Sequence, residues 1–473
     1  MSERCSVPSC SDTSGSEVTT LLLRNAELVL TMDAETPQIK HGGLFVRDNV
    51  IEAVGPTKEL PQEADEIIDG DGMIVLPGLI NTHHHLYQTL TRALPGAQDV
   101  ELFDWLIRLY PVWGEMNDEA VYTSAMIGMA ELVLSGCTTS TDHLYIYPND
   151  STLDSTIRAA QELGLRFHPT RGSMSLGKSK GGLPPDHVVE EEHDILADSR
   201  RVIEQYHDPK PFSMVRVGLA PCSPFSVTGQ LMQETAELAR ASDNVILHTH
   251  VAETADEETF CLEQFGTRPA EYMRQLGWVG PDVWWAHAIY LNDDEIQMLA
   301  ETGTGVAHCP TSNMRLGSGI AKVRQMRDAG VKVGIAVDGS ASNDGNDLLL
   351  ETRMALLLQR VEGGADAFGV MEALELATLG SASVIGRDDL GRLSTGMAAD
   401  FIGIKTDRLT MAGGAVHDPV ASLLLCAAKG VDLSVINGRR VVEGGELVGL
   451  DLEQVVARHN ELAKGMADKH QLT

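Results

Sequence analysis

The middle of the chain, from residue 77 to about residue 395, alternates short apolar runs with longer stretches of helical periodicity. Eight of the apolar runs predict strands, and their last residues are Asn81, Asp142, Pro169, Ala220, His248, Ala286, His308 and Asp338. Stretches such as 118–135, 152–163 and 229–240 predict amphipathic helices between them. Eight strand–helix units in succession predict an α/β fold of the (β/α)8 TIM-barrel type, with the chemistry at the carboxyl ends of the strands.

The two ends of the chain have a different pattern. Residues 19–76 contain short strand-like runs separated by turn signals such as Gly70-Asp71-Gly72. Strand patterns return in residues 398–450, where Asn437-Gly438 predicts a hairpin turn. We therefore predict a composite β-sandwich from residues 19–76 and 398–450 around a barrel of residues 77–397. Residues 451–473 predict a C-terminal helix, and residues 1–18 predict a disordered tail.

Composition and charge limit the kinds of partner that the protein is expected to bind. The chain has 68 acidic and 36 basic side chains and a formal net charge of −32, a field that opposes nucleic acids and anionic membranes. No apolar run reaches the ~18 residues of a transmembrane helix, and the N-terminus lacks a secretory signal. Seven scattered cysteines without a CxxC motif predict reduced thiols and a cytoplasmic protein. The acidic surface fits a high-salt habitat and an ordinary acidic bacterial protein equally well.

Histidines follow two of the predicted strands in a pattern suited to metal binding. His83 and His85 share one face of an extended segment because side chains alternate along a strand, and two imidazoles can bind a divalent metal. His84 points the other way and is expected to be structural. His248 and His250 share a face in the same manner, so both are candidate ligands, although one of them alone could be a packed histidine.

Three further polar groups stand at or near strand ends. Glu253 follows His250 closely enough to act as a proton carrier in the same pocket. His287 closes the apolar run 283–286, and Asp338 closes the run 333–337. A carboxylate in such a place is costly to bury unless it binds a metal or hydrogen-bond donors. Each group alone is more often a satisfied core residue, but four strands ending this way predict a functional site.

The order of these motifs resembles the amidohydrolase superfamily, in particular its cytosine and guanine deaminase-like branch. The resemblance rests on Pro77-Gly78-Leu79-Ile80-Asn81-Thr82-His83-His84-His85, on His250-Val251-Ala252-Glu253, and on the two strand-end groups. It implies that His83, His85, His250 and Asp338 bind the metal. It also implies that Glu253, His287 and Asp338 are catalytic, with His248 outside the ligand set.

The same resemblance bears on the cofactor and the assembly. No lysine ends the third or fourth predicted strand, where binuclear relatives carry a bridging lysine. One metal per chain is therefore expected, as Zn²⁺ or as Fe²⁺, which suits this ligand set almost equally. The resemblance also implies a small heterocyclic substrate and a homo-oligomer.

Longer runs resemble the bacterial 8-oxoguanine deaminases, with the triazine hydrolases next. They are residues 170–177, 220–226 and 308–316. The resemblance implies hydrolysis of 8-oxoguanine to urate and ammonia, with guanine deamination or hydroxytriazine N-dealkylation as alternatives. Gln88 would hold the heterocycle's edge, Arg171 would bind a ring carbonyl, and Trp113 or Tyr110 would stack on the ring.

Three other interpretations are weaker. Cys222 or Cys309 could supply a thiol nucleophile, but a metal hydroxide already fills that role. A metal-free scaffold on the same fold would have lost ligands, and every ligand position is filled here. A zinc-dependent nucleic-acid editor would need a Cys-containing ligand motif and a basic groove, and this sequence has neither feature.

Overall fold

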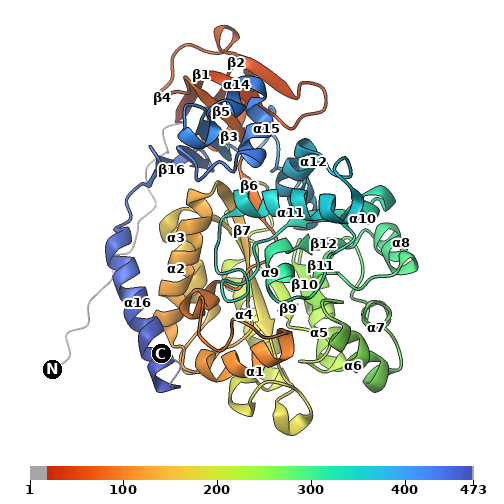
Figure 1. The fold of residues 1–473 in the computed structure, drawn as a ribbon. Helices are drawn as coiled ribbons and strands as arrows, with labels where there is room; N and C mark the ends of the chain where they lie inside the picture. Colours follow the sequence, from red (N-terminus) through yellow and green to blue (C-terminus); the bar gives the residue numbers. More distant parts are fainter. Residues whose placement is uncertain (1–18, 471–473) are drawn as a thin grey trace, which may run out of the picture.

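Both ends of the chain contribute to one mixed sheet in the computed structural model, which describes residues 19–470 (Figure 1). Its strands are β1 (Thr20–Leu30), β2 (Gln38–Arg47), β3 (Val50–Pro56), β4 (Glu66–Asp69), β5 (Met73–Pro77), β14 (Phe401–Lys405), β15 (Leu433–Ile436), β16 (Arg439–Glu443) and β17 (Glu446–Leu447). The order is β17-β16-β15-β14-β5-β1-β2-β3, with β4 beside β1. The antiparallel pair of β5 and β14 joins the N-terminal part to the C-terminal part. The predicted tail, residues 1–18, lies outside the described residues.

Eight parallel strands form the barrel in the middle of the chain. They are β6 (Leu79–Asn81), β7 (Cys137–Leu144), β8 (Arg166–Ser173), β9 (Gly218–Pro221), β10 (Ile246–Val251), β11 (Val283–His287), β12 (Gly305–His308) and β13 (Lys332–Ile335). Each strand pairs with the next along the chain. Between the last and first strands, the backbone N–H of Thr82 donates to the Ile335 carbonyl at 3.0 Å. The predicted (β/α)8 barrel is therefore confirmed.

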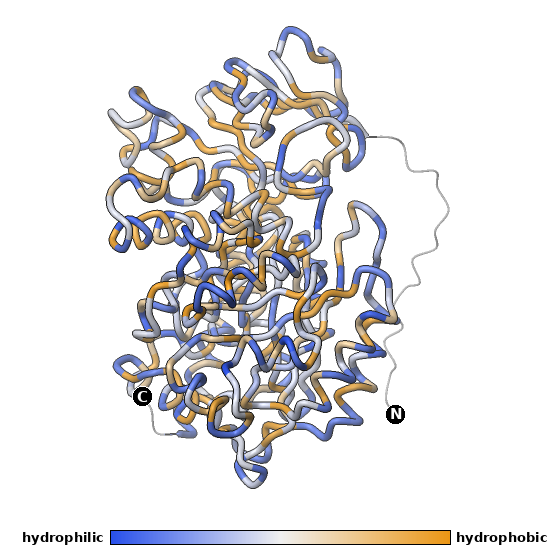
Figure 2. The backbone as a smooth tube through the Cα atoms, turned by 90° about the vertical axis from the view of Figure 1, so that its right-hand side faces the viewer, coloured by the Kyte–Doolittle hydropathy of each residue, from blue (hydrophilic) through white to orange (hydrophobic). Residues whose placement is uncertain are grey.

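Helices cover the outside of the barrel, and apolar segments run through the middle of the molecule (Figures 1 and 2). The helices are α1 (Leu102–Trp113), α2 (Asp118–Leu134), α3 (Leu153–Leu163), α4 (Glu192–Tyr206), α5 (Gly229–Arg240), α6 (Ala255–Phe265), α7 (Pro269–Gln275), α8 (Asp293–Thr302), α9 (Pro310–Arg315), α10 (Val323–Ala329), α11 (Leu348–Gly363), α12 (Val370–Glu375), α13 (Ser381–Val384), α14 (Gly414–His417), α15 (Pro419–Leu425) and α16 (Leu452–Lys469). α16 lies along α2 on the flank of the barrel. Within residues 19–470, none of these helices has the length and apolar character needed to cross a membrane.

Six of the eight barrel strands end at other residues than the sequence predicts; β9 and β11 differ by one residue, and β8 continues past Pro169 to Ser173. Strand β7 continues past Asp142 to Leu144, and β10 continues past His248 to Val251. Strand β13 ends at Ile335, three residues before Asp338. In β7 every side chain is buried although most are polar. An apolar pattern cannot locate the end of such a strand.

Candidate metal centre and active-site cavity

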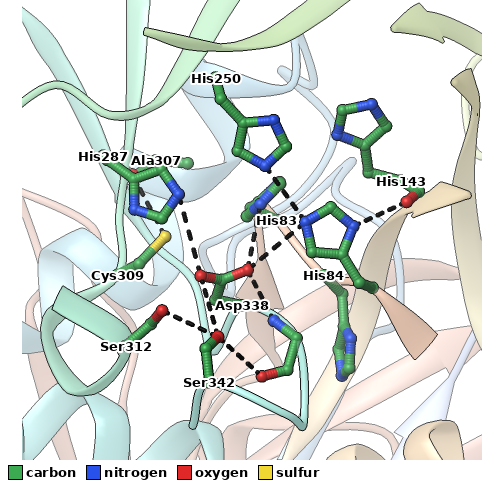
Figure 3. Close-up of polar contacts among 12 residues, drawn as sticks. His83, His84, His143, His250, His287, Ala307, Cys309, Ser312, Asp338 and Ser342 are labelled. Atoms are coloured by element: carbon green, nitrogen blue, oxygen red, sulfur yellow. Dashed lines mark hydrogen bonds and ion pairs between the residues drawn. The ribbon is translucent and has the colours of Figure 1, made fainter. Parts of the chain in front are cut away.

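The carboxyl ends of four barrel strands bring His83, His85, His250, His287 and Asp338 into one buried cluster (Figure 3). The Nε2 atoms of His85 and His250 lie 3.1 Å apart. Asp338 Oδ1 lies 3.3 Å from the Nε2 of His83 and 3.6 Å from that of His85. Asp338 Oδ2 lies 3.8 Å from the Nε2 of His287. The predicted spatial convergence is thus present in the structure.

Backbone carbonyls set the protonation of two of these rings. The Nδ1 of His85 lies 2.7 Å from the carbonyl oxygen of His143, and the Nδ1 of His250 lies 2.6 Å from that of Cys222. A carbonyl oxygen can only accept, so each Nδ1 carries the proton and each Nε2 presents a lone pair. The two Nε2 atoms therefore face each other with no proton between them, an arrangement that a bound cation stabilises.

A chain of two histidines orients the third imidazole. The Nδ1 of His248 donates to the Trp284 carbonyl at 3.0 Å, so its Nε2 accepts the proton of His83 Nδ1 at 2.7 Å. The Nε2 of His83 is then a bare, buried atom without a hydrogen-bond partner among residues 19–470. His248 thus fixes the orientation of His83 from outside the cluster.

The carboxylate of Asp338 is held in place by its own loop. Its Oδ1 accepts from the backbone N–H of Gly339 at 2.6 Å, and Ser342 Oγ lies 3.4 Å from Oδ2. Asp338 has φ 63° and His287 has φ 70°, both in the left-handed region that side-chain-bearing residues seldom adopt. Such strain persists only where the surroundings enforce it, and it is concentrated at functional sites.

The donor set fits a divalent metal. Three imidazole nitrogens with free lone pairs and one carboxylate match the ligands that zinc prefers. The potential ligand atoms of His83, His287 and Asp338 lie within 4.8 Å of one another, as do those of His83, His85, His143 and His250. The molecule therefore contains a buried His/Asp metal site at the carboxyl end of the barrel.

Glu253 and His287 lie beside this site as a pair. The Glu253 Oε2 is 3.5 Å from the His287 Nε2. Burial raises the pKa of Glu253 to about 7, so this carboxyl can both give and take a proton near neutral pH. Glu257 fixes the turn that carries Glu253, because its carboxylate accepts from the backbone N–H groups of Ala252 and Glu253 at 2.9 and 2.8 Å.

A cavity opens from the metal site under helix α1. Its wall combines polar groups with an apolar, largely aromatic face: His85, Gln88, Leu102, Trp105, Leu106, Tyr110, Tyr145, Cys222, Ser223, Phe225, His250, Glu253, His287, Leu316, Asp338 and Ser342. Gln88 lies on this wall, where its Oε1 accepts from the Ala341 N–H at 3.2 Å. A wall that combines several aromatic side chains with a few fixed polar groups suits a planar heterocycle.

Two of the predicted substrate contacts lie away from this cavity. Arg171 is buried and bonded to Glu190 and Asp198, at 2.7 and 2.9 Å. Trp113 is fully buried, and its indole N–H donates to Thr91 Oγ1 at 3.0 Å. Neither residue is among those that line the cavity, so the cavity wall gives no support to their predicted contact with the substrate. The alternative stacking residue Tyr110 does line the cavity, as do Trp105 and Tyr145, which the sequence did not single out.

Sequence reasoning also missed His143, which lies in strand β7 beside the ligand cluster. Its ring stacks on that of His250 at 5.0 Å, and its Nε2 donates to the Ala220 carbonyl at 2.8 Å. The Nδ1 is buried and has no hydrogen-bond partner within the described chain. The only signal in the sequence was a histidine directly after Asp142, where the predicted strand ended, two residues before the end of β7.

Cys222 also lies on the cavity wall. Burial raises the pKa of its thiol to about 12, so the sulfur stays protonated at neutral pH. A protonated thiol is a poor nucleophile. The structure therefore gives no support to cysteine-based catalysis at this site.

A (β/α)8 barrel with a His/Asp metal site and a proton-handling carboxyl at its carboxyl end defines a metal-dependent hydrolase. The chain belongs to the amidohydrolase family, whose model matches residues 74–441.

Known proteins similar to the chain agree with this family. An 8-oxoguanine deaminase of Pseudomonas aeruginosa is 47% identical over 90% of this chain and 95% of its own length. A hydroxydechloroatrazine ethylaminohydrolase of a Pseudomonas strain is 37% identical over 93% of this chain and 94% of its own. The crystal structure of an Arthrobacter aurescens atrazine chlorohydrolase, complexed with zinc, is 36% identical and superposes with a TM-score of 0.89 over 94% of this chain and 100% of its own.

Proposed function

We propose that this protein is a zinc-dependent deaminase that hydrolyses 8-oxoguanine to urate and ammonia. The observation that carries the proposal is the convergence of three bare imidazole nitrogens, Asp338 and the Glu253–His287 pair on one cavity. The substrate is supported by the Pseudomonas aeruginosa 8-oxoguanine deaminase, at 47% identity over nearly the whole chain.

His83, His85, His250 and Asp338 would hold one zinc ion per chain. When bound, the metal supplies a Lewis acid that makes water nucleophilic near neutral pH. Zinc is supported by the N/O donor set and by the zinc in the Arthrobacter aurescens relative. Because iron suits the same ligands, metal analysis of protein purified without added metal distinguishes the two.

The remaining residues move protons. Asp338 and His287 take the proton of the attacking water and direct the attack toward the amino-bearing ring carbon. Glu253, with its pKa of about 7, protonates the adjacent ring nitrogen, so that negative charge does not build up there. It then carries a proton to the exocyclic nitrogen, which leaves as ammonia.

Gln88 would hold the polar edge of the purine, and Tyr110 and Trp105 would contact its face. The Oε1 of Gln88 is already engaged by the Ala341 N–H, which fixes the orientation of the amide. An amide so fixed selects the hydrogen-bonding pattern of one heterocycle edge. Arg171 has no place in this model of binding because its guanidinium is bonded to Glu190 and Asp198.

Two alternative reactions follow from the same site. Guanine deamination needs the same chemistry on a ring that lacks the 8-oxo group. A hydroxytriazine N-dealkylating aminohydrolase is supported by the 37% identical relative, which is a hydroxydechloroatrazine ethylaminohydrolase. Both alternatives keep the deaminating machinery and change only the substrate.

A substrate panel tests the proposal. We expect kcat/KM to be highest for 8-oxoguanine among 8-oxoguanine, guanine, isoxanthopterin, cytosine and hydroxyatrazine, each assayed by ammonia release. A higher value for guanine or hydroxyatrazine would replace the substrate and keep the reaction class. Background rates on every compound with zinc-loaded protein would refute the deaminase proposal itself.

A further inference from the structure

A second cavity, of about 660 Å³, lies at the opposite, amino-terminal mouth of the barrel. It opens between the segments that precede β9 and β10, the start of β13 and the segment that follows α13. Four cationic residues are on its wall: Arg216, Lys332, Arg387 and Arg392. Asp388 is the acidic residue on the wall. None of the residues lining this cavity lines the active-site cavity.

The arginines buried in the described chain fall into two kinds. Arg166 pairs with Asp400 at 2.8 Å, Arg171 with Glu190 at 2.7 Å, and Arg387 with Asp389 at 2.7 Å. Arg216, only 7% exposed, is the exception among residues 19–470, since no carboxylate lies within ion-pair distance of it. A buried cation without a counter-charge is costly, so Arg216 has an unmet requirement for an anion.

Neutral groups hold the guanidinium of Arg216. It donates to Ser213 Oγ at 3.1 Å and to the carbonyl oxygens of Lys210, Pro209 and Gly386 at 3.1 to 3.4 Å. Burial lowers the pKa of Arg216 to about 10 and the neighbouring Arg387 adds to the effect, while the charges of Asp389 and Asp388, beyond ion-pair distance, oppose it. These contacts orient the guanidinium, but they bring no carboxylate within ion-pair distance of it.

Two more cations on the wall are free of ion pairs. Within the part of the chain described here, neither the half-buried Lys332 nor the exposed Arg392 has a carboxylate partner. In a chain with a formal net charge of −32, most basic groups have acidic neighbours available. Three cations that line one cavity and have no carboxylate partner favour the binding of an anion from solution.

We propose that this cavity binds a phosphoryl group, as free phosphate or as a phosphate monoester, between Arg216, Lys332 and Arg392. The planar guanidinium groups match the oxygens of a phosphate, and the ammonium of Lys332 adds a third charge. The cavity is within the 300–1,000 Å³ typical of ligand pockets, so it has room for a nucleotide-sized monoester as well as for the ion alone. Asp388 is also on the wall, so it would repel any negatively charged group of the ligand that lies close to it.

Calorimetric titration of the zinc-loaded, full-length protein tests this site. Sodium phosphate and AMP are titrated separately at constant ionic strength, into wild type and into the double variant Lys332→Gln/Arg392→Gln. Arg216 is kept because its bonds hold the loop around residues 209–213. We expect saturable binding to wild type and a Kd raised about tenfold or more in the double variant. Tighter binding of AMP would assign the site to a monoester, and equal binding would assign it to the free ion.

A matched control separates the site from general charge effects. Lys178→Gln/Lys464→Gln removes the same two charges from exposed positions elsewhere, and should leave the Kd within about twofold of wild type. The absence of saturable binding to wild type would overturn the proposal. Equal weakening of phosphate binding by both double variants would also overturn it. So would phosphate binding that is unchanged in Lys332→Gln/Arg392→Gln, because that binding would belong to the metal centre. Deaminase activity should be the same in all three proteins, which keeps this test independent of the proposed function.

Discussion

The two mouths of the barrel bury charge in opposite ways. At the carboxyl mouth, imidazoles and carboxyls crowd together with bare lone pairs facing one another, as in the 3.1 Å approach of His85 to His250. At the amino mouth, arginines such as Arg166 and Arg387 are buried with bidentate carboxylate partners. The pairs formed by Arg166 and Arg387 are complete without a ligand, whereas the imidazole cluster is complete only with a cation. The comparison teaches that an uncompensated buried group marks function more clearly than burial alone.

The largest expected effect comes from removing a charge at the carboxyl mouth. Asp338→Asn keeps the shape of the side chain but leaves the three imidazole lone pairs without the carboxylate. We expect the zinc content, measured by mass spectrometry of the purified protein, to fall well below one per chain. Deamination should fall by about 10⁴-fold or more, because both the metal and a proton acceptor are affected. Full zinc content in Asp338→Asn would remove this residue from the ligand set.

Glu253→Gln separates proton transfer from metal binding. The amide introduced by this change retains the size of the side chain but cannot donate a proton to the ring, so kcat should fall by roughly 10²–10⁴-fold. Zinc content should stay at the wild-type value because Glu253 is not in the proposed ligand set. Glu237→Gln, an exposed change on helix α5, is a matched control and should keep wild-type kcat and zinc. Near-normal turnover in Glu253→Gln would exclude this residue from the mechanism.

At the amino mouth, removal of a carboxylate charge should lower the stability of the fold and leave zinc binding and catalysis unchanged. Asp400 accepts two bonds at 2.8 Å from the fully buried Arg166 and one at 2.7 Å from the Asn437 N–H, so it ties the barrel to the composite sheet. Asp400→Asn leaves Arg166 without a counter-charge and should lower the free energy of unfolding by about 3–5 kcal/mol. Urea denaturation followed by circular dichroism measures this loss.

The control for Asp400→Asn is Asp432→Asn, which removes a carboxylate paired with the more exposed Arg408. That change should cost about 1 kcal/mol or less. Zinc content and kcat per folded molecule should be unchanged in both variants. A loss of zinc in Asp400→Asn would mean that the two mouths are coupled, contrary to the comparison.

The fold and most of the metal cluster could be predicted from the sequence, because strand spacing and the alternation of His83 and His85 are local signals. The position of His143 could not, because the polar strand β7 has no apolar pattern to mark its end. Arg171 and Trp113, which the structure places outside the cavity wall, illustrate another limit of the sequence. Both have the chemistry of substrate contacts, but their partners Glu190, Asp198 and Thr91 are brought to them only by the tertiary fold.

The smallest effect expected at the carboxyl mouth concerns Gln88, whose backbone N–H donates to the His85 carbonyl but whose side-chain amide bonds to Ala341 and is proposed to act on the substrate alone. Gln88→Ala removes one hydrogen-bonding group from the cavity wall and leaves the Ala341 N–H without its acceptor. We expect KM for 8-oxoguanine to rise about tenfold, in line with the loss of a single polar contact, while zinc content is retained. Gln98→Ala, at an exposed position outside the cavity, is the control and should leave KM unchanged. If Gln88→Ala lowers kcat strongly with KM unchanged, Gln88 acts in the transition state, and the division between metal chemistry and substrate recognition within this mouth must be redrawn.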